Sequence, residues 1–490
     1  MTKKGAGSRF NPSRRQFLAG MAAAGGSIML PGCGSGISGA VDLTGIGSRT
    51  LPSPDKSGID HIVVVMMENR SFDHFLGWAP GADGLQQGLS FPDKSGAMQN
   101  TFRLSQNSEY GFQGCGWNDP DHSYKGGRVE LNNGAMNGWL LTDGTTAPDR
   151  FPIGYYTADD LPFYKNAVEN YTICDRYFCS ILSQTFPNRF YMHAGQTDRN
   201  DNALTFSTLP TIWDRLAAKG RSAKFYFSDV PFIGLWREKY LSITQPFVAF
   251  QAAAAAGQLP DVSYIDPNFG ALVGEPGGFS QDDHPQADIR AGQAFLNQVY
   301  ETLRTSPQWE KTLLIINYDE WGGFYDHVAP PLAPVTAEEV AAIGNDGHLG
   351  FRVPCVLMGP RARKGYVDHL QYDHNSILNF ICWRFDLEGL GARTHTSNNL
   401  AYALNLDGAA RTDAPQFSVP SGPFNGACVA NPQDPSQGPN GVALPLASLP
   451  LLGIPTAANP AVPKNASYDQ HVAEWQGLVE LTKQLGFPQP

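Results

Sequence analysis

Two pairs of oxygen-bearing residues stand at the ends of apolar runs and are the first candidates for chemistry. Glu68 and Asn69 follow the apolar run 63–67, and Asp319 and Glu320 close a second such run. Carboxylate and amide oxygens suit a divalent ion such as Mg, Ca, Mn or ferrous iron, and no nearby Cys or His pair indicates zinc. The four residues therefore predict one divalent metal ion. The plainer alternatives are an ion pair for Glu68 and a solvated turn for the second pair.

The geometry of a strand sets a condition on this hypothesis. Adjacent residues on a strand point to opposite faces, so both members of a pair can reach one ion only where the strand has broken. Gly322 and Gly323 predict such a break after the second pair. The first pair requires an equally sharp break at Glu68.

Thr185 is the candidate nucleophile. It stands in the segment 183–189, at a cap position of a predicted helix with Pro187 in the first turn. The free N–H groups and positive dipole end of such a helix favour a bound phosphate. Coordination to a divalent ion would lower the pKa of the hydroxyl and make it a nucleophile. A simple N-cap threonine is the plainer alternative.

The elements that must position these residues alternate along the chain. Short apolar runs that end in polar clusters predict strands, and amphipathic segments between them predict helices. This alternation indicates α/β architecture with a mainly parallel sheet, whose ligands bind at the carboxyl ends of the strands. The predicted strands lie at about 59–67, 223–227, 262–265, 312–316 and 353–358, and the predicted helices at 212–219, 288–305 and 376–385.

The N-terminal segment predicts export. Arg14 and Arg15 precede the apolar stretch 19–30, the pattern of a twin-arginine signal, and this stretch is too short and too rich in Gly and Ala to predict a membrane span. Leu30 to Cys33 resembles a bacterial lipobox, in which Cys33 would carry the lipid. The sequence thus predicts a periplasmic or secreted protein with a possible membrane anchor.

The remaining chain divides by composition. Residues 77–157 are rich in Gly, Asn, Asp and Trp and predict long loops over the site. The predicted parts are a signal with lipobox at 1–33, a tether at 34–56, a catalytic domain at 57–412, and an extended arm with a terminal helix packed on the core at 413–490. The apolar stripe of that helix comprises Val472, Trp475, Leu478, Val479 and Leu485.

Charge and cysteine content limit the classes of function. Without five basic residues of the leader, 30 basic residues remain against 46 acidic ones, a net charge of −16. No basic stripe is present, which argues against a nucleic-acid partner. Cys174 and Cys179 are close enough in the sequence to form a disulfide or could be free, and the apolar surroundings of Cys355 and Cys382 are typical of buried thiols.

Several motifs in this order, over roughly residues 59–385, resemble the bacterial phosphoesterase family of phospholipases C and acid phosphatases, in the alkaline-phosphatase-like superfamily. The resemblance implies a three-layer α/β sandwich with a largely parallel central sheet. It also implies that Glu68, Asn69, Asp319 and Glu320 bind the metal and that Thr185 attacks phosphorus. The motifs are MENRSFDHFLG, TFPNR, DDHP, NYDEWGGFYDHV and YDHNSIL.

The resemblance also suggests roles for histidines. His122 and His284 match family positions near the phosphate, where either would bind its oxygens or protonate the leaving group. His327 and His374 are weaker candidates, because a histidine beside an aspartate at a helix start is typical of a structural role. His74 is expected to pack or cap near the first strand.

The predicted function is an exported, metal-dependent phosphoric ester hydrolase of phospholipase C type, acting on phospholipid or soluble phosphoesters through a phosphothreonine. One alternative is an acid phosphatase of the same family, because the chain lacks the extra C-terminal domains of the longer phospholipases while shorter ones also exist. A second alternative is a surface lipoprotein that binds phosphorylated ligands without turnover, for which a hydroxyl at Thr185 would be unnecessary.

Overall fold

The structure is a computed structural model that describes residues 50–115, 117–143, 145, 148–270, 280–424 and 466–490, with backbone alone at 466–474. The twin-arginine segment, Cys33, and most of the predicted tether and arm lie outside these residues. They remain predictions. Among the described residues, no helix is long and apolar enough to span a bilayer.

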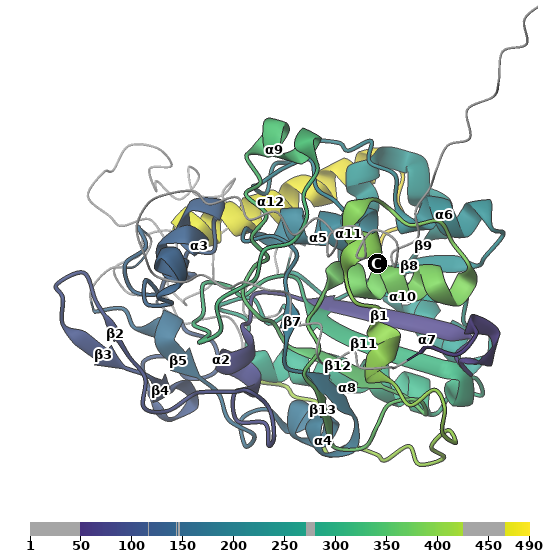
Figure 1. Ribbon diagram of the computed structural model, residues 1–490, viewed down its shortest axis with the longest axis horizontal. Coiled ribbons are helices and arrows are strands. Elements are labelled where there is room, and N and C mark those ends of the chain that lie inside the picture. The colour runs from purple at the N-terminus through teal and green to yellow at the C-terminus, as the bar shows by residue number, and fades with distance from the viewer. Residues whose placement is uncertain (1–49, 116, 144, 146–147, 271–279, 425–465) are drawn as a thin grey trace, which may run out of the picture. The chain divides into compact units, whose positions relative to one another are not determined.

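An eight-stranded sheet forms the centre of the fold, in the order β13-β6-β12-β11-β1-β10-β8-β9 (Figure 1). Every neighbouring pair is parallel except the two that involve β12, which runs antiparallel to β11 and β6. The predicted α/β fold with a largely parallel sheet is confirmed. The strands are β1 His61–Met67, β6 Thr172–Cys174, β8 Ala223–Phe227, β9 Thr244–Pro246, β10 Val262–Asp266, β11 Thr312–Tyr318, β12 Cys355–Met358 and β13 Tyr366–Asp368.

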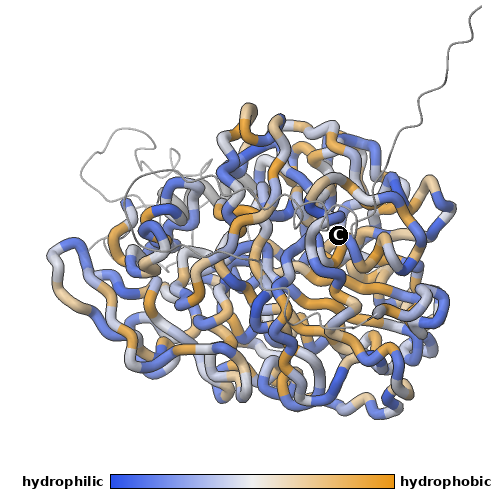
Figure 2. Tube along the Cα trace, in the orientation of Figure 1, coloured by the Kyte–Doolittle hydropathy of each residue, from blue (hydrophilic) through white to orange (hydrophobic). Residues whose placement is uncertain are grey.

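The central strands are buried on both faces, as their unbroken apolar runs predict. Residues 62–67 of β1 and all residues of β11 are buried, and these strands form hydrophobic segments in the interior (Figure 2). Such runs arise where helices cover both faces of a sheet, because no face then needs polar residues. β1 and β11 pair in register from His61 with Thr312 to Met67 with Tyr318, so they end at the same edge.

Helices cover the sheet in two layers (Figure 1). On one side α5 contacts both α6 and α10, and on the other α8 contacts both α4 and α7. The helices are α2 Phe72–Leu76, α3 Tyr124–Leu131, α4 Pro162–Asn170, α5 Thr185–Ala194, α6 Ile212–Ala218, α7 Phe247–Ala255, α8 Ile289–Arg304, α9 Ala337–Ile343, α10 His374–Phe385, α11 Ala392–Thr396 and α12 Ala466–Gln484.

The segment 77–157, predicted as loops, also contains regular elements. Helix α3 was not predicted; its N-cap Ser123 accepts a hydrogen bond from the backbone N–H of Gly126 at 2.9 Å. Within this segment, β2 Ser90–Pro92 pairs with β3 Met98–Asn100, and β4 Phe102–Arg103 pairs with β5 Gly154–Tyr155. A third small pairing, outside the segment, joins β7 Tyr177–Phe178 with β14 Tyr372–Asp373.

The terminal helix α12 contributes aromatic and aliphatic side chains to the core. Trp475 stacks on Phe269 with ring centroids 3.9 Å apart, and Leu478 and Val479 are buried. The side chain of Val472 lies outside the described part of the chain. Cys174, Cys179, Cys355 and Cys382 are free and buried, whereas Cys115 is disulfide-bonded.

Candidate active site

The two predicted ligand pairs leave the sheet side by side. Glu68 and Asn69 follow the last residue of β1, and Asp319 and Glu320 follow the last residue of the adjacent strand β11. The backbone N–H of Asn69 donates to Oδ1 of Asp319 at 3.3 Å, and that of Arg70 donates to the carbonyl of Glu320 at 3.2 Å. These hydrogen bonds therefore hold the residues that follow β1 against the residues that follow β11.

Both strands break sharply at these pairs. Asn69 has a φ of 58°, in the left-handed region that non-glycine residues seldom adopt, so the backbone turns directly after Glu68. Gly322 and Gly323 have φ values of 65° and 70°. A Cβ on Gly322 would lie 2.2 Å from the carbonyl oxygen of Asn69, so only glycine lets the two turns approach this closely.

Gly322→Ala is expected to disturb the ligand pairs without altering any of their side chains. The added methyl group overlaps the Asn69 carbonyl and meets an unfavourable φ, so we expect a loss of about 1–3 kcal/mol in the free energy of unfolding and weaker divalent-ion binding. Chemical denaturation and calorimetric titration with Mn²⁺ measure the two effects. Gly344→Ala is the matched control, because Gly344 also has a positive φ, of 68°, but an added Cβ there meets nothing within 4 Å. Equal effects from both variants would contradict the role of the close approach.

Buried oxygen atoms with unused hydrogen-bonding capacity favour a bound cation here. All four residues are 0% exposed. Burying a carboxylate oxygen without a partner is costly, whereas coordination to a cation satisfies it. Among the described residues, the oxygens with no hydrogen-bond partner include Oε1 and Oε2 of Glu68, Oδ1 of Asn69, Oδ2 of Asp319 and Oε1 of Glu320.

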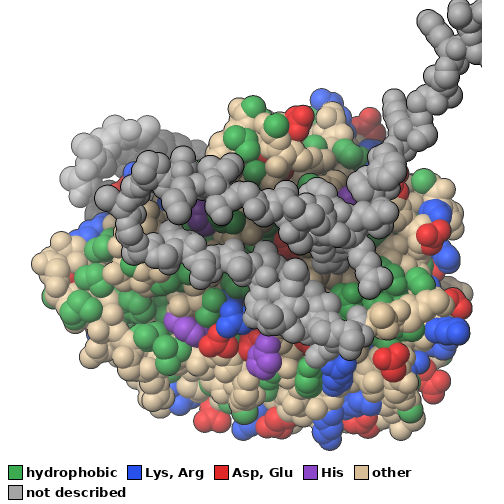
Figure 3. All heavy atoms as spheres, viewed as in Figure 1, with side chains coloured by type: hydrophobic (Ala, Val, Ile, Leu, Met, Phe, Trp, Pro, Cys, Tyr) green, Lys and Arg blue, Asp and Glu red, His purple; other side chains and the backbone are tan. Residues whose placement is uncertain are grey.

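The electrostatics of this cluster agree with its need for positive charge. Burial, followed by the neighbouring Asp319, raises the pKa of Glu68 well above its usual value. Burial also raises the pKa of Asp319, and it raises that of Glu320 to about 8 although His122 acts against it. On the face shown in Figure 3, acidic and basic side chains are interspersed. The buried cluster is dominated by acids, and a bound cation would favour their ionised forms.

Thr185 is the first residue of α5 and not its cap. The N-cap is Gln184, which makes no side-chain cap hydrogen bond. Thr185 is 1% exposed, and its hydroxyl oxygen has no hydrogen-bond partner among the described residues. The prediction that it occupies a cap position is therefore wrong by one residue, and in the first turn the backbone N–H of Phe186 donates to Asn202 Oδ1 at 2.8 Å and not to Thr185. The hydroxyl thus remains available for another role.

The rest of the motif fixes this helix start in place. The Asn188 side-chain amide donates to the carbonyls of Ile181, Ser183 and Gln184 at 3.1, 2.8 and 3.2 Å, which holds the preceding loop. Arg189, four residues after Thr185, extends to the ends of three strands. Its guanidinium lies 3.3 Å from Glu68, 3.3 Å from Asp319 and 3.0 Å from Asp266.

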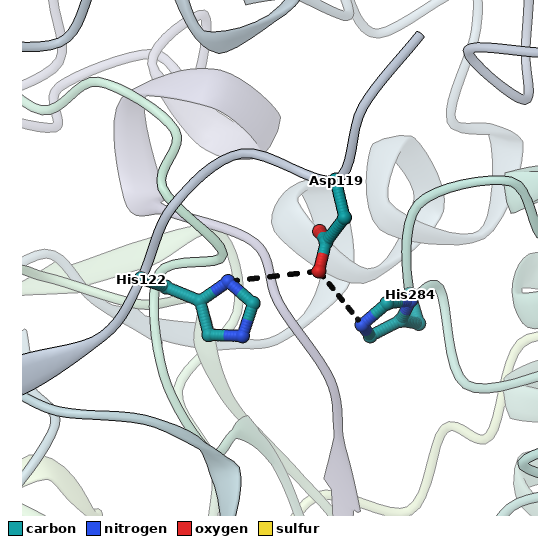
Figure 4. Close-up of side chains that lie close together, drawn as sticks. All are labelled: Asp119, His122 and His284. Atoms are coloured by element: carbon teal, nitrogen blue, oxygen red, sulfur yellow. Dashed lines mark ion pairs between the residues drawn. The ribbon is translucent and has the colours of Figure 1, made fainter. Parts of the chain in front are cut away.

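His122 and His284 lie on either side of one carboxylate, that of Asp119 (Figure 4). Asp119 Oδ2 is 3.8 Å from Nδ1 of His122 and 3.5 Å from Nε2 of His284. These three residues form one of the described clusters that could hold a metal ion. Nδ1 of His122 lies 2.8 Å from the Pro120 carbonyl, a hydrogen bond that leaves Nε2 to face the ligand pairs.

His122 connects this group to the ligand pairs. Its Nε2 is 3.5 Å from Nδ2 of Asn69 and 3.9 Å from Oε1 of Glu320. Burial disfavours the protonated ring, but Glu320 and Asp119 outweigh burial and raise the pKa of His122 to about 10. The two carboxylates thus favour the protonated ring, which can donate a hydrogen bond to an anion or supply a proton.

The other histidines make structural contacts. His374 is buried, with Nε2 2.8 Å from the carbonyl of Asp319, and burial lowers its pKa to about 3. His74 packs on Phe324 at 3.9 Å between ring centroids. His327 contacts Asp73 through Nδ1 at 2.5 Å.

A second cluster, Asp73, Asp326 and His327, also has the spacing of a metal site. Buried Arg352 already lies among its carboxylates, with Nη2 3.1 Å from Asp73 and Nε 2.9 Å from Asp326. Unlike the oxygens of the two ligand pairs, both oxygens of Asp73 and of Asp326 accept hydrogen bonds from backbone N–H groups, so no oxygen there lacks a partner that a metal ion would supply. We interpret the cluster as a structural network.

Three residues of the site received no role from the sequence: Asp119, Arg189 and Asp266. Asp119 and Arg189 stand within motifs that also carry predicted residues, the segment 118–122 and TFPNR. Asp266 closes the predicted strand 262–265, as Glu68 closes the first strand. A search for acids at every strand end would have found it.

Comparison with known proteins adds independent information. Residues 59–388 match the model of the Phosphoesterase family. Non-specific phospholipase C1 of Arabidopsis thaliana is 32% identical over 405 residues, which cover 74% of each chain. Phospholipase C A of Mycobacterium tuberculosis is 29% identical over 524 aligned positions, covering 94% of this chain and 95% of that protein.

Among solved structures, a phosphonate monoester hydrolase of Agrobacterium radiobacter aligns with a TM-score of 0.33 and 8% identity, over 71% of this chain and 77% of that one. This distant similarity carries no functional conclusion.

Proposed function

We propose that this chain, which belongs to the phosphoesterase family and is a hydrolase of phosphoester bonds, is a phospholipase C. In this proposal the enzyme depends on a metal ion and acts through Thr185. One observation carries this proposal. The buried oxygens of Glu68, Asn69, Asp319 and Glu320 and the buried hydroxyl of Thr185 have no hydrogen-bond partner among the described residues. Such atoms are costly in a merely structural cluster.

Glu68, Asn69, Asp319 and Glu320 would hold one divalent ion, because all four offer oxygen at adjoining strand ends. When bound, such an ion supplies positive charge that lowers the pKa of a nearby hydroxyl and offsets charge on phosphoryl oxygens. Its identity is left open among Mg, Ca, Mn and ferrous iron, since these ions share the same ligand types.

The residues of the chain would divide the reaction into two displacements. The Thr185 oxygen attacks phosphorus in line, the P–O bond to the alcohol breaks, and the alcohol leaves with a proton. Water then attacks the phosphothreonine, which releases the phosphorylated product and restores the hydroxyl. The positive dipole end of α5 would face the phosphoryl oxygens and favour their negative charge.

His122 and His284 would bind the phosphoryl oxygens and supply the proton. Nδ1 of His122 is held by the Pro120 carbonyl and Nδ1 of His284 lies 3.1 Å from the Pro285 carbonyl. Asp119 lies between the two rings. This arrangement suits a pair of hydrogen-bond donors of fixed orientation.

The substrate is proposed to be a phospholipid. Relatives from a plant and a bacterium are named phospholipase C. The predicted twin-arginine signal and lipidated Cys33 would bring the chain to a membrane after export, which favours a lipid substrate. Fractionation of host cells that express the full chain, with Cys33→Ala as the comparison, tests this location.

Parallel assays on two substrates test the proposed activity. We expect hydrolysis of phosphatidylcholine micelles to give diacylglycerol and phosphocholine, with a kcat/KM at least about tenfold above that for a soluble phosphomonoester such as p-nitrophenyl phosphate. The reverse preference would identify an acid phosphatase. Phosphate binding without release of any alcohol would identify a binding protein.

A further inference from the structure

Arg189 is a buried cation at the centre of the candidate metal site. Its side chain is 1% exposed, and its three nitrogens face carboxylates at the ends of three adjacent strands: Glu68 after β1, Asp266 at the end of β10, and Asp319 after β11. Two of these acids are candidate metal ligands. A positive charge among them changes how the site behaves before any metal ion is bound.

The three contacts differ in kind. The contact with Asp266 is a hydrogen bond of 3.0 Å from Nη1, and Nη2 also donates to the Met66 carbonyl at 3.2 Å. The contacts with Glu68 and Asp319, both 3.3 Å, are ion pairs, and the oxygens involved have no hydrogen-bond partner among the described residues. Arg189 is thus bonded to Asp266 and to β1, while it attracts the two ligands by charge alone. Their lone pairs remain available.

The sequence position of Arg189 links the same group to the nucleophile. Arg189 stands four residues after Thr185 in α5, a spacing that places two side chains on one face of a helix. The contacts of Arg189 therefore fix the start of α5 against the strand ends.

We propose that Arg189 is a positioning residue that holds Glu68 and Asp319 at their ligand positions and balances their charge before the metal ion binds. The inference rests on the proposed metal-dependent function. Without this guanidinium, two carboxylates would be buried beside Glu320 with no positive charge from α5. The metal-free protein would then be unstable, and the metal ion would have to supply the missing charge.

Thermal unfolding of the full chain with and without Mn²⁺ tests the charge balance. For Arg189→Met we expect the metal-free midpoint to fall by at least about 5 °C and saturating Mn²⁺ to restore most of the loss. The rise on adding Mn²⁺ should therefore exceed that of the wild type. An equal rise in the variant and the wild type would overturn the proposal.

Arg352→Met is the matched control. Arg352 is 0% exposed and pairs with two buried carboxylates, Asp73 and Asp326, but it contacts none of the candidate ligands. We expect a comparable fall in the midpoint and no change in the rise produced by Mn²⁺. A larger Mn²⁺-induced rise in this control as well would overturn the specific role of Arg189.

Arg189→Lys keeps the charge and separates positioning from charge balance. A single ammonium cannot reach three carboxylates as the planar guanidinium does, so calorimetric titration should show about tenfold weaker Mn²⁺ binding. An unchanged Mn²⁺ affinity of Arg189→Lys would overturn the positioning role. This test can be made even if Arg189→Met fails to fold. If the wild type binds none of Mg²⁺, Ca²⁺, Mn²⁺ or Fe²⁺, the proposed metal site is wrong and this inference is wrong with it. That outcome is measured on the wild type alone, so it is distinguished from a failure of the role of Arg189.

Discussion

Replacing Thr185 by alanine should lower kcat for phosphoester hydrolysis by roughly a thousandfold or more. The variant removes the oxygen that would attack phosphorus and leaves the four candidate metal ligands in place. Its fold should be little affected, because the wild-type hydroxyl has no hydrogen-bond partner to lose among the described residues. Steady-state turnover of phosphatidylcholine micelles, with circular dichroism and thermal unfolding of the same preparation, measures both effects.

Thr185→Ser is the matched control for this result. Serine restores the hydroxyl at the first position of α5 and lacks only the methyl group, so activity should return to within about tenfold of the wild type. Rapid quenching during turnover of phosphatidylcholine, followed by mass spectrometry, should find a phosphocholine group on the α5 peptide of the wild type and of the serine variant. The same peptide of the alanine variant should carry none. A folded alanine variant with near wild-type turnover would rule out Thr185 as the nucleophile.

Removal of divalent ions should abolish activity in a reversible way. Among the described residues, the negative charge of Glu68, Asp319 and Glu320 is paired only with Arg189 and His122. We therefore expect dialysis against a chelator to lower turnover by at least about a hundredfold, and one divalent ion to restore it on titration. Elemental analysis of protein purified from its native host identifies that ion.

Asp319→Asn tests the same metal dependence at a single candidate ligand. Asparagine keeps the size of the side chain and one oxygen but removes the charge, so metal affinity should fall by about 10- to 100-fold and a higher metal concentration should partly restore turnover. Asp326→Asn, in the same segment of the chain but paired with Arg352, should leave metal affinity unchanged. Full activity of a verified metal-free protein would be incompatible with the proposed mechanism.

The sequence predicted the central strands of the sheet because these strands are buried on both faces, whereas the short strands β6, β9 and β13 were not predicted. The run at about 59–67 contains β1, and the run at 312–316 covers most of β11. Such strands have no polar face, so their apolar runs stand out from the surrounding sequence. Helices α6 and α8 were equally clear, because each has one apolar face on the sheet.

Helix α3 was missed because its sequence contains two adjacent glycines, which have low helix propensity. The structure explains why glycine is present: a Cβ on Gly127 would lie 2.8 Å from Leu182 Cγ. Close packing therefore outweighed local propensity, and a single sequence does not reveal contacts between distant segments.

The candidate ligands were predictable because each pair ends an apolar run, but the contacts between segments were not. Asp119 and His284 are far apart in the sequence, and only the folded chain shows that Asp119 lies between His284 and His122. The importance of Arg189 was hidden in the same way, because its partners stand on three different strands.

The order of β1 and β11 along the chain limits when the site can exist during synthesis. Asn69 and Asp319, joined by a hydrogen bond across 250 residues, meet only after β11 has entered the sheet. Until residues 312–320 have been synthesised, the chain therefore carries Glu68 and Asn69 without Asp319 and Glu320. In the proposed metal site, the full ligand set would therefore form only after β11 has paired with β1.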